Sequence, residues 1–157
     1  MNVAENLENA HLLVIQSVDN LNELEWDIPI AEDSRTVKDI VAHLASYEHL
    51  LVDMFNVVLG TSSDTPYLTQ YRTQHADFNK IQVEARSNHT AQQVVDEFEE
   101  AQADATSLLA RIPIETIEKK GTLGDKERSL GDIVVALTGH IQRHCAEITA
   151  FRNREKQ

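Results

Sequence analysis

Apolar residues recur every three or four positions along most of the chain, which is the spacing of helices that bury one face. The first such stretch predicts a helix from about Val3 to Trp26, and Pro29 closes that segment. The second begins at Thr36 and ends at Gly60, a residue suited to a helix C-cap. No segment alternates apolar and polar residues for long enough to indicate a strand. The pattern therefore predicts an all-α protein.

Two more long helices are predicted in the second half of the chain. One runs from Thr90 until Pro113 stops it, and the last runs from Ser129 to about Asn153. The starts "TVKD", "TAQQ" and "SLGD" each place a hydroxyl residue three positions before an acidic or amide residue, which is a capping box. A shorter helix is expected over about 66–85, and "GTLGDKERS" is interpreted as a turn. We expect one domain over 1–157, a four-helix bundle with a short extra helix between its second and third long helices.

The second and last long helices resemble each other in sequence. Laying "TVKDIVAHL" over "SLGDIVVAL" matches Asp39, Ile40, Val41 and Leu44 with identical residue types. Either a helix pair has been duplicated, or two capped amphipathic helices look alike by chance. A true repeat would place the two helices close together in space, where side chains from distant segments can form one site.

Charge and composition limit the partners of this protein. The 157 residues include 14 basic and 26 acidic side chains, and the net charge of −12 repels phosphate backbones and anionic lipid. We therefore expect no nucleic-acid or membrane partner. No apolar run approaches the length of a membrane span, and the first residues do not resemble a signal peptide, so a cytoplasmic location is expected. The single cysteine, Cys145, allows no internal disulfide and is interpreted as a small core residue.

Two histidines lie one helical turn apart in the last helix, within "LTGHIQRHCAEI". His144 is predicted near the centre of the buried face, with His140 beside it. An i, i+4 pair can offer two ligands to a metal ion. His43, at the edge of the buried face of the second helix, is the best third ligand, and His11 is a reserve candidate. The alternative is that these are hydrogen-bonded core or surface histidines without a metal.

The segments "TVKDIVAHLASYEHLL" and "SLGDIVVALTGHIQRHCAEI" resemble the DinB superfamily, which includes DinB-like and YfiT-like proteins and the N-terminal domain of mycothiol-dependent maleylpyruvate isomerase. The stretch "FNKIQVEARSNHTAQQVVDEFEEA" resembles the isomerase-like members. The resemblance implies a four-helix bundle with an unusual helix order. It also implies that a divalent metal is held by His43, His140 and His144, and that the protein forms a dimer. The resemblance does not indicate whether this metal is zinc, nickel or manganese.

The resemblance implies chemistry on a small molecule at the open positions of that metal. Either a low-molecular-weight thiol cofactor is activated for transferase or isomerase chemistry, or the metal supports hydrolysis. The sequence does not indicate whether such a cofactor is mycothiol, bacillithiol or glutathione. Glu48 is a candidate catalytic base, or else a partner of a histidine or arginine. Arg86 and Asn79 are candidates for binding an anionic substrate or cofactor. The alternative function is a non-catalytic metal- or ligand-binding bundle in a stress response.

Two positions depart from the resemblance. Many relatives have tryptophan where Arg35 and Tyr47 stand on either side of the motif of the second helix. Neither change touches the three histidines, but both alter the pocket beside them. Glu147, three residues after His144, is interpreted as a solvated helix charge.

Overall fold

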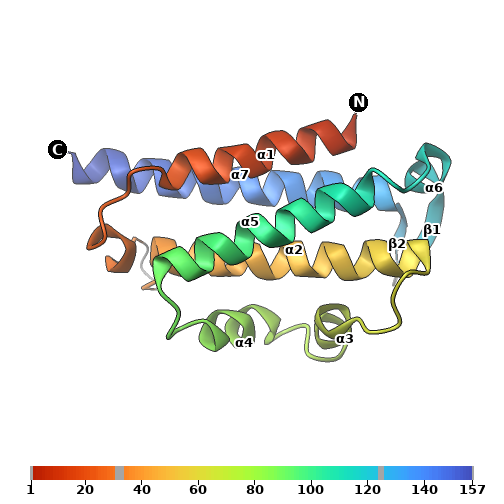
Figure 1. Cartoon of the computed structure of the whole chain (residues 1–157), viewed down its shortest axis with the longest axis horizontal. Helices are drawn as coiled ribbons and strands as arrows, with labels where there is room; N and C mark the ends of the chain where they lie inside the picture. The colour runs from red at the N-terminus through yellow and green to blue at the C-terminus, as the bar shows by residue number, and fades with distance from the viewer. Residues whose placement is uncertain (1, 31–33, 124–125, 157) are drawn as a thin grey trace.

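The computed structural model describes residues 2–30, 34–123 and 126–156 and is dominated by four long helices (Figure 1). These are α1 (Val3–Val18), α2 (Val37–Leu59), α5 (Ala91–Leu109) and α7 (Leu130–Glu155). α1 packs mainly along α7, and α2 packs mainly along α5. The prediction of an all-α four-helix bundle is confirmed.

All three predicted capping boxes are present. Thr36, Thr90 and Ser129 each accept a hydrogen bond from the backbone amide three residues later, and that residue's side chain accepts one from the cap amide. Gly60 ends α2 in the left-handed region at φ 68°, where a residue with a side chain is strained. These local signals therefore fix where α2, α5 and α7 begin, and where α2 ends.

The first helix is shorter than the sequence pattern predicted. α1 stops at Val18, and the chain turns through Asp19 and Asn20, whose φ is +58°. Asp and Asn favour such turns because their short polar side chains tolerate the left-handed region. A separate 3₁₀ turn, η1 (Glu25–Asp27), then buries Trp26. The apolar spacing continued past the helix because both segments face the same core.

The extra helix between α2 and α5 is two helices. α3 (Pro66–Thr73) and α4 (Phe78–Ala85) are separated by a break over residues 74–77. The break has no apolar residue large enough to hold a continuous helix against α2. The buried side chain of Leu68 anchors α3, and that of Phe78 anchors α4. Both helices lie against α2.

The segment before α7 also differs from the prediction of a simple turn. After the short helix α6 (Ile114–Glu118), strands β1 (Lys120–Leu123) and β2 (Lys126–Ser129) form an antiparallel pair, with Lys120 opposite Ser129. Four-residue strands are too short to show alternation in a sequence. The pair leads directly into α7, because Ser129 is both the last residue of β2 and the N-cap of the helix.

The core lies between the long helices and contains side chains from all four. Its largest fully buried apolar members include Leu7, Leu44, Leu51, Phe55, Phe98, Leu109, Ile148 and Phe151. α2 and α7 are not principal partners, yet they approach each other at their histidines. Among the described residues, no helix has the length and apolar character needed to cross a membrane.

Candidate metal centre

His43 on α2 and His140 and His144 on α7 meet at one point. The Nε2 atom of His140 lies 3.0 Å from Nε2 of His43 and 3.0 Å from Nε2 of His144. Each residue offers one ligand atom, and these atoms all lie within 4.8 Å of one another. His144 is buried, whereas His43 and His140 are partly exposed, so the cluster lies at the edge of the bundle.

The donor set fits a metal ion. A neutral imidazole nitrogen carries either one hydrogen or one lone pair, so Nε2 of His140 cannot make two good in-plane hydrogen bonds. Nitrogens bound to one ion at about 2.1 Å stand roughly 3.0 to 3.4 Å apart when the bonds make angles of 90° to 109°. The two observed separations of 3.0 Å fall in that range. Three convergent imidazoles also leave positions for water or substrate, as at catalytic metal sites.

The three histidines are neutral at ordinary pH. Burial and the neighbouring imidazoles of His140 and His144 lower the pKa of His43 to about 3. Burial and His144 lower the pKa of His140 to about 4, while burial and the charge of Arg35 lower that of His144 to about 4. The neutral imidazole is the form that donates a lone pair to a metal, so the site is in its metal-binding form without losing protons.

The carboxylate of Glu147 lies between His144 and Arg35. Oε1 of Glu147 lies 3.2 Å from Nδ1 of His144, and Oε2 of Glu147 lies 3.4 Å from Nη2 of Arg35. The contact with His144 does not have hydrogen-bond geometry, since Nδ1 of His144 has no hydrogen-bond partner among the described residues, but a carboxylate this close favours the tautomer with its proton on Nδ1. Glu147 was interpreted as a solvated charge, so its place here was missed. The sequence did contain a signal for this contact, because residues three positions apart on one helix are neighbours, as His144 and Glu147 are.

Tyr47 covers another side of the cluster. Its ring packs edge-on against His43 and His140 at centroid distances of 5.0 and 5.1 Å. Its hydroxyl donates a hydrogen bond to Oδ1 of Asn79 at 2.9 Å, and burial raises its pKa. Phe78 packs against the same ring at 5.6 Å. Asn79, a candidate for substrate binding, thus reaches the histidines through Tyr47.

Glu48, the candidate base, is part of a different pair. Its carboxylate contacts Nε2 of His11 on α1, and the two residues are 1% and 3% exposed. The ring of His11 packs edge-on against Phe98 of α5. The pair therefore lies where α1, α2 and α5 meet. The structure brings the reserve ligand His11 to Glu48 and places neither in the three-histidine cluster.

Arg86, the other candidate for anion binding, is buried and holds helices together. Its guanidinium donates two hydrogen bonds to Glu97 of α5, at 2.6 and 2.7 Å, and others to Gln82 and Tyr67. His49 also contacts Glu97, at 2.8 Å. Burial of Glu97 alone would raise its pKa, but these hydrogen bonds hold it at about 2. Arg86 therefore pairs with a carboxylate of the protein itself, that of Glu97.

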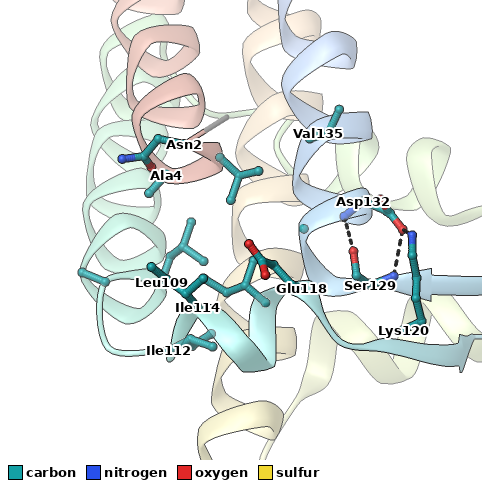
Figure 2. A pocket seen from close by; sticks show the side chains of 14 residues that line it. Asn2, Ala4, Leu109, Ile112, Ile114, Glu118, Lys120, Ser129, Asp132 and Val135 are labelled. Carbon is teal, nitrogen blue, oxygen red and sulfur yellow. Dashed lines mark hydrogen bonds and ion pairs between the residues drawn. The ribbon is translucent and has the colours of Figure 1, made fainter.

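Two further features, Cys145 and a surface trough, lie outside the three-histidine cluster. Cys145 is buried, as a core residue would be, and burial raises the pKa of its thiol. A trough of about 750 Å³ lies between α6 and the starts of α1 and α7 (Figure 2), with Ile114 and Val135 among its walls. Figure 2 shows Asp132 in this trough already engaged by Lys120 and Ser129. None of the three clustered histidines lines it.

Solved structures share this fold at low identity. YfiT from Bacillus subtilis, described as a probable metal-dependent hydrolase with an unusual four-helix bundle topology, is 17% identical, with a TM-score of 0.69 over 98% of this chain and 86% of that chain. An uncharacterised protein from Clostridium difficile 630 is 11% identical, with a TM-score of 0.79 over 96% and 94%. A protein from Streptococcus pneumoniae is 12% identical, with a TM-score of 0.78 over 96% and 88%.

Among curated proteins, no sequence matches this chain. The sequence profile described as the DinB superfamily matches residues 6–148, which include all of α2 and α5, most of α1 and α7, and all three clustered histidines. The match covers nearly the whole chain and agrees with the bundle seen in the structure. The chain belongs to the DinB superfamily.

Proposed function

We propose that His43, His140 and His144 bind one divalent metal ion and that the protein is a metal-dependent enzyme acting on a small molecule, with hydrolysis as the favoured reaction. The observation that carries this proposal is the position of His140, whose Nε2 lies 3.0 Å from the Nε2 atoms of both other histidines. The description of YfiT as a probable metal-dependent hydrolase supports the same reaction class.

A divalent ion at such a site lowers the pKa of a water molecule and polarises a carbonyl or phosphoryl oxygen. The chain supplies three neutral donors, all on helices, which hold them more rigidly than loops do. The carboxylate of Glu147, 3.2 Å from Nδ1 of His144, favours the tautomer of that ring that leaves the Nε2 lone pair for a metal. The ring of Tyr47 covers His43 and His140 and limits the access of water from that side.

The test is hydrolysis by protein loaded with zinc, nickel or manganese against esters, amides and phosphoesters. We expect turnover of at least one class, its loss on chelation, and its return when the metal is restored. His144→Asn should abolish the activity, whereas His49→Asn should retain it, because His49 contacts Glu97 instead of the cluster. Hydrolysis that is unchanged by chelation and by His144→Asn would contradict the proposal.

A thiol-dependent transferase or isomerase is the second candidate. It is favoured by the resemblance of "FNKIQVEARSNHTAQQVVDEFEEA" to isomerase-like members of the superfamily. The same three histidines would hold the metal, which activates the thiolate of the cofactor. Turnover that appears only when mycothiol, bacillithiol or glutathione is added would favour this candidate over hydrolysis. Metal binding without turnover in either assay would leave the non-catalytic alternative.

A further inference from the structure

Tyr47 is in contact with proposed metal ligands from both helices that form the cluster. Its ring lies edge-on against the imidazole of His43, four residues earlier on α2, with 5.0 Å between the ring centroids. The same ring lies 5.1 Å from the imidazole of His140 on α7, at an interplanar angle of 62°. Tyr47 is half-buried, so its ring fills space beside two of the three ligands. A single side chain thus restricts imidazoles that belong to two different helices.

Hydrogen bonds from other side chains do little to orient these two imidazoles. Among the described residues, Nδ1 of His140 is buried without a hydrogen-bond partner, and the imidazole of His43 makes no hydrogen bond outside the cluster. A metal-bound histidine normally donates a hydrogen bond from its second ring nitrogen, which fixes the rotation of the ring. His144 differs, because the carboxylate of Glu147 lies 3.2 Å from its Nδ1. The rotation of His43 and His140 therefore depends on packing.

Tyr47 is itself held by side chains of α3 and α4. Its hydroxyl donates a hydrogen bond to Oδ1 of Asn79 at 2.9 Å. Its ring packs edge-on against Phe78 at 5.6 Å and against Tyr71 at 6.4 Å, which is a favourable arrangement of aromatic rings. Phe78 is only 1% exposed and is therefore a fixed part of the core. The position of the Tyr47 ring thus depends on the docking of α3 and α4 against α2.

We propose that Tyr47 is a positioning residue of the metal centre, that its ring holds His43 and His140 in the arrangement that binds the ion, and that Asn79 holds Tyr47 in place. The proposal rests on the metal site proposed above and adds the residues that preform it. Donors that are already in place bind an ion more tightly, because less conformational entropy is lost on binding. Asn79 therefore acts through Tyr47 and not by contact with a substrate.

The test measures the affinity of the full-length protein for cobalt(II) by competition with a chelator, together with the visible spectrum of the bound ion. Loss of a side chain that orients metal ligands weakens metal binding about tenfold to a hundredfold, and we expect an effect of this size in Tyr47→Leu. The spectrum should change as well, since water replaces a displaced imidazole and the absorption of cobalt(II) depends on its coordination number and geometry. Wild-type affinity and spectrum in Tyr47→Leu would overturn the proposal.

Tyr47→Phe and Asn79→Ala remove the same hydrogen bond and leave the aromatic ring in place. Each should weaken cobalt binding by about two- to tenfold, the effect of one neutral hydrogen bond. The double variant should bind no more weakly than either single variant, because the bond can be lost only once. These variants keep the packing of the ring, so they test the proposal even if Tyr47→Leu does not fold. Unchanged affinity in both single variants, or additive losses in the double variant, would overturn it.

Tyr67→Leu is the matched control. Tyr67 is another half-buried tyrosine, on α3, whose ring stacks on His49 at 4.5 Å and whose hydroxyl accepts a hydrogen bond from Arg86. None of these residues belongs to the cluster. Tyr67→Leu should therefore lower the free energy of unfolding in urea and leave the affinity for cobalt within about threefold. Equal weakening in Tyr47→Leu and Tyr67→Leu would mean that metal binding only follows general stability, and it would overturn the proposal.

The metal site and the role of Tyr47 fail in distinguishable ways. If the wild type takes up no cobalt, the metal site is wrong and the role of Tyr47 falls with it. If the wild type takes up one equivalent and Tyr47→Leu binds it equally well, the metal site stands and the positioning role of Tyr47 is wrong.

Discussion

His140 Nε2 on α7 lies 3.0 Å from His43 Nε2 on α2, although the two residues are 97 positions apart. Each of these helices has another principal neighbour, α1 for α7 and α5 for α2. Two imidazoles that were protonated would repel each other at this distance. Their lowered pKa values, about 3 for His43 and about 4 for His140, agree with a pair that remains neutral and available to a metal.

These pKa values predict metal binding that changes little between pH 7.5 and 5.5. An imidazole whose pKa is about 4 or lower has no proton to lose in this interval, so proton competition begins only as the pH approaches 4. Three independent imidazoles with a pKa of about 6.5 would lose roughly a thousandfold in affinity at pH 5.5. The dissociation constant of cobalt(II) or zinc, measured by competition with a chelator across this range, should change by less than about tenfold.

The pH experiment also has a clear contrary result. A dissociation constant that rises by two orders of magnitude or more between pH 7.5 and 5.5 would show that the histidines titrate normally in the metal-free protein. His49→Asn is the control, since His49 is outside the cluster and its removal should leave the pH profile unchanged.

The buried pair of Glu48 and His11 predicts a stability defect instead of a catalytic one. Glu48→Ala leaves a buried polar group without its partner, which costs roughly 3 to 5 kcal/mol when the pair is charged. We expect a lower free energy of unfolding in urea and an unchanged metal content. The double variant His11→Leu/Glu48→Leu should recover much of the loss. If Glu48→Ala unfolds like the wild type but loses turnover, Glu48 is catalytic after all.

Replacing Arg86 should likewise lower the stability of the protein. Arg86→Met removes the partner of the Glu97 carboxylate, so we expect a loss of about 3 to 5 kcal/mol in the free energy of unfolding. Arg72→Met, at an exposed position of α3, should change stability by less than about 0.5 kcal/mol. A stable Arg86→Met protein that has lost turnover would instead make Arg86 a substrate-binding residue.

The sequence predicted the elements that depend on local signals. The capping boxes at Thr36, Thr90 and Ser129 fix helix starts within a few residues, so they can be recognised without knowledge of the fold. His140 and His144 were paired by helical spacing alone. His43 was added from its place in the second helix and from the resemblance to a known family, and the structure brings it to them.

What the sequence did not predict depends on contacts between distant segments. Angular position alone placed Glu48 on the buried face, and it left open whether the carboxylate is a base or a partner; the structure pairs it with His11. Arg86 carries no mark in the sequence that separates a buried ion pair from a substrate ligand. Arg35 and Glu147 are 112 positions apart, so their contact beside His144 follows only from the packing of α7 near the start of α2.

The central claim is that three histidines form one metal site, and metal content measures it most directly. Protein purified after incubation with zinc, then desalted and analysed by mass spectrometry of the elements, should hold about one equivalent per chain. His140→Asn should hold much less, because His140 is next to both other ligands, and His49→Asn should hold as much as the wild type. Equal zinc in all three proteins, or none in the wild type, would contradict the account.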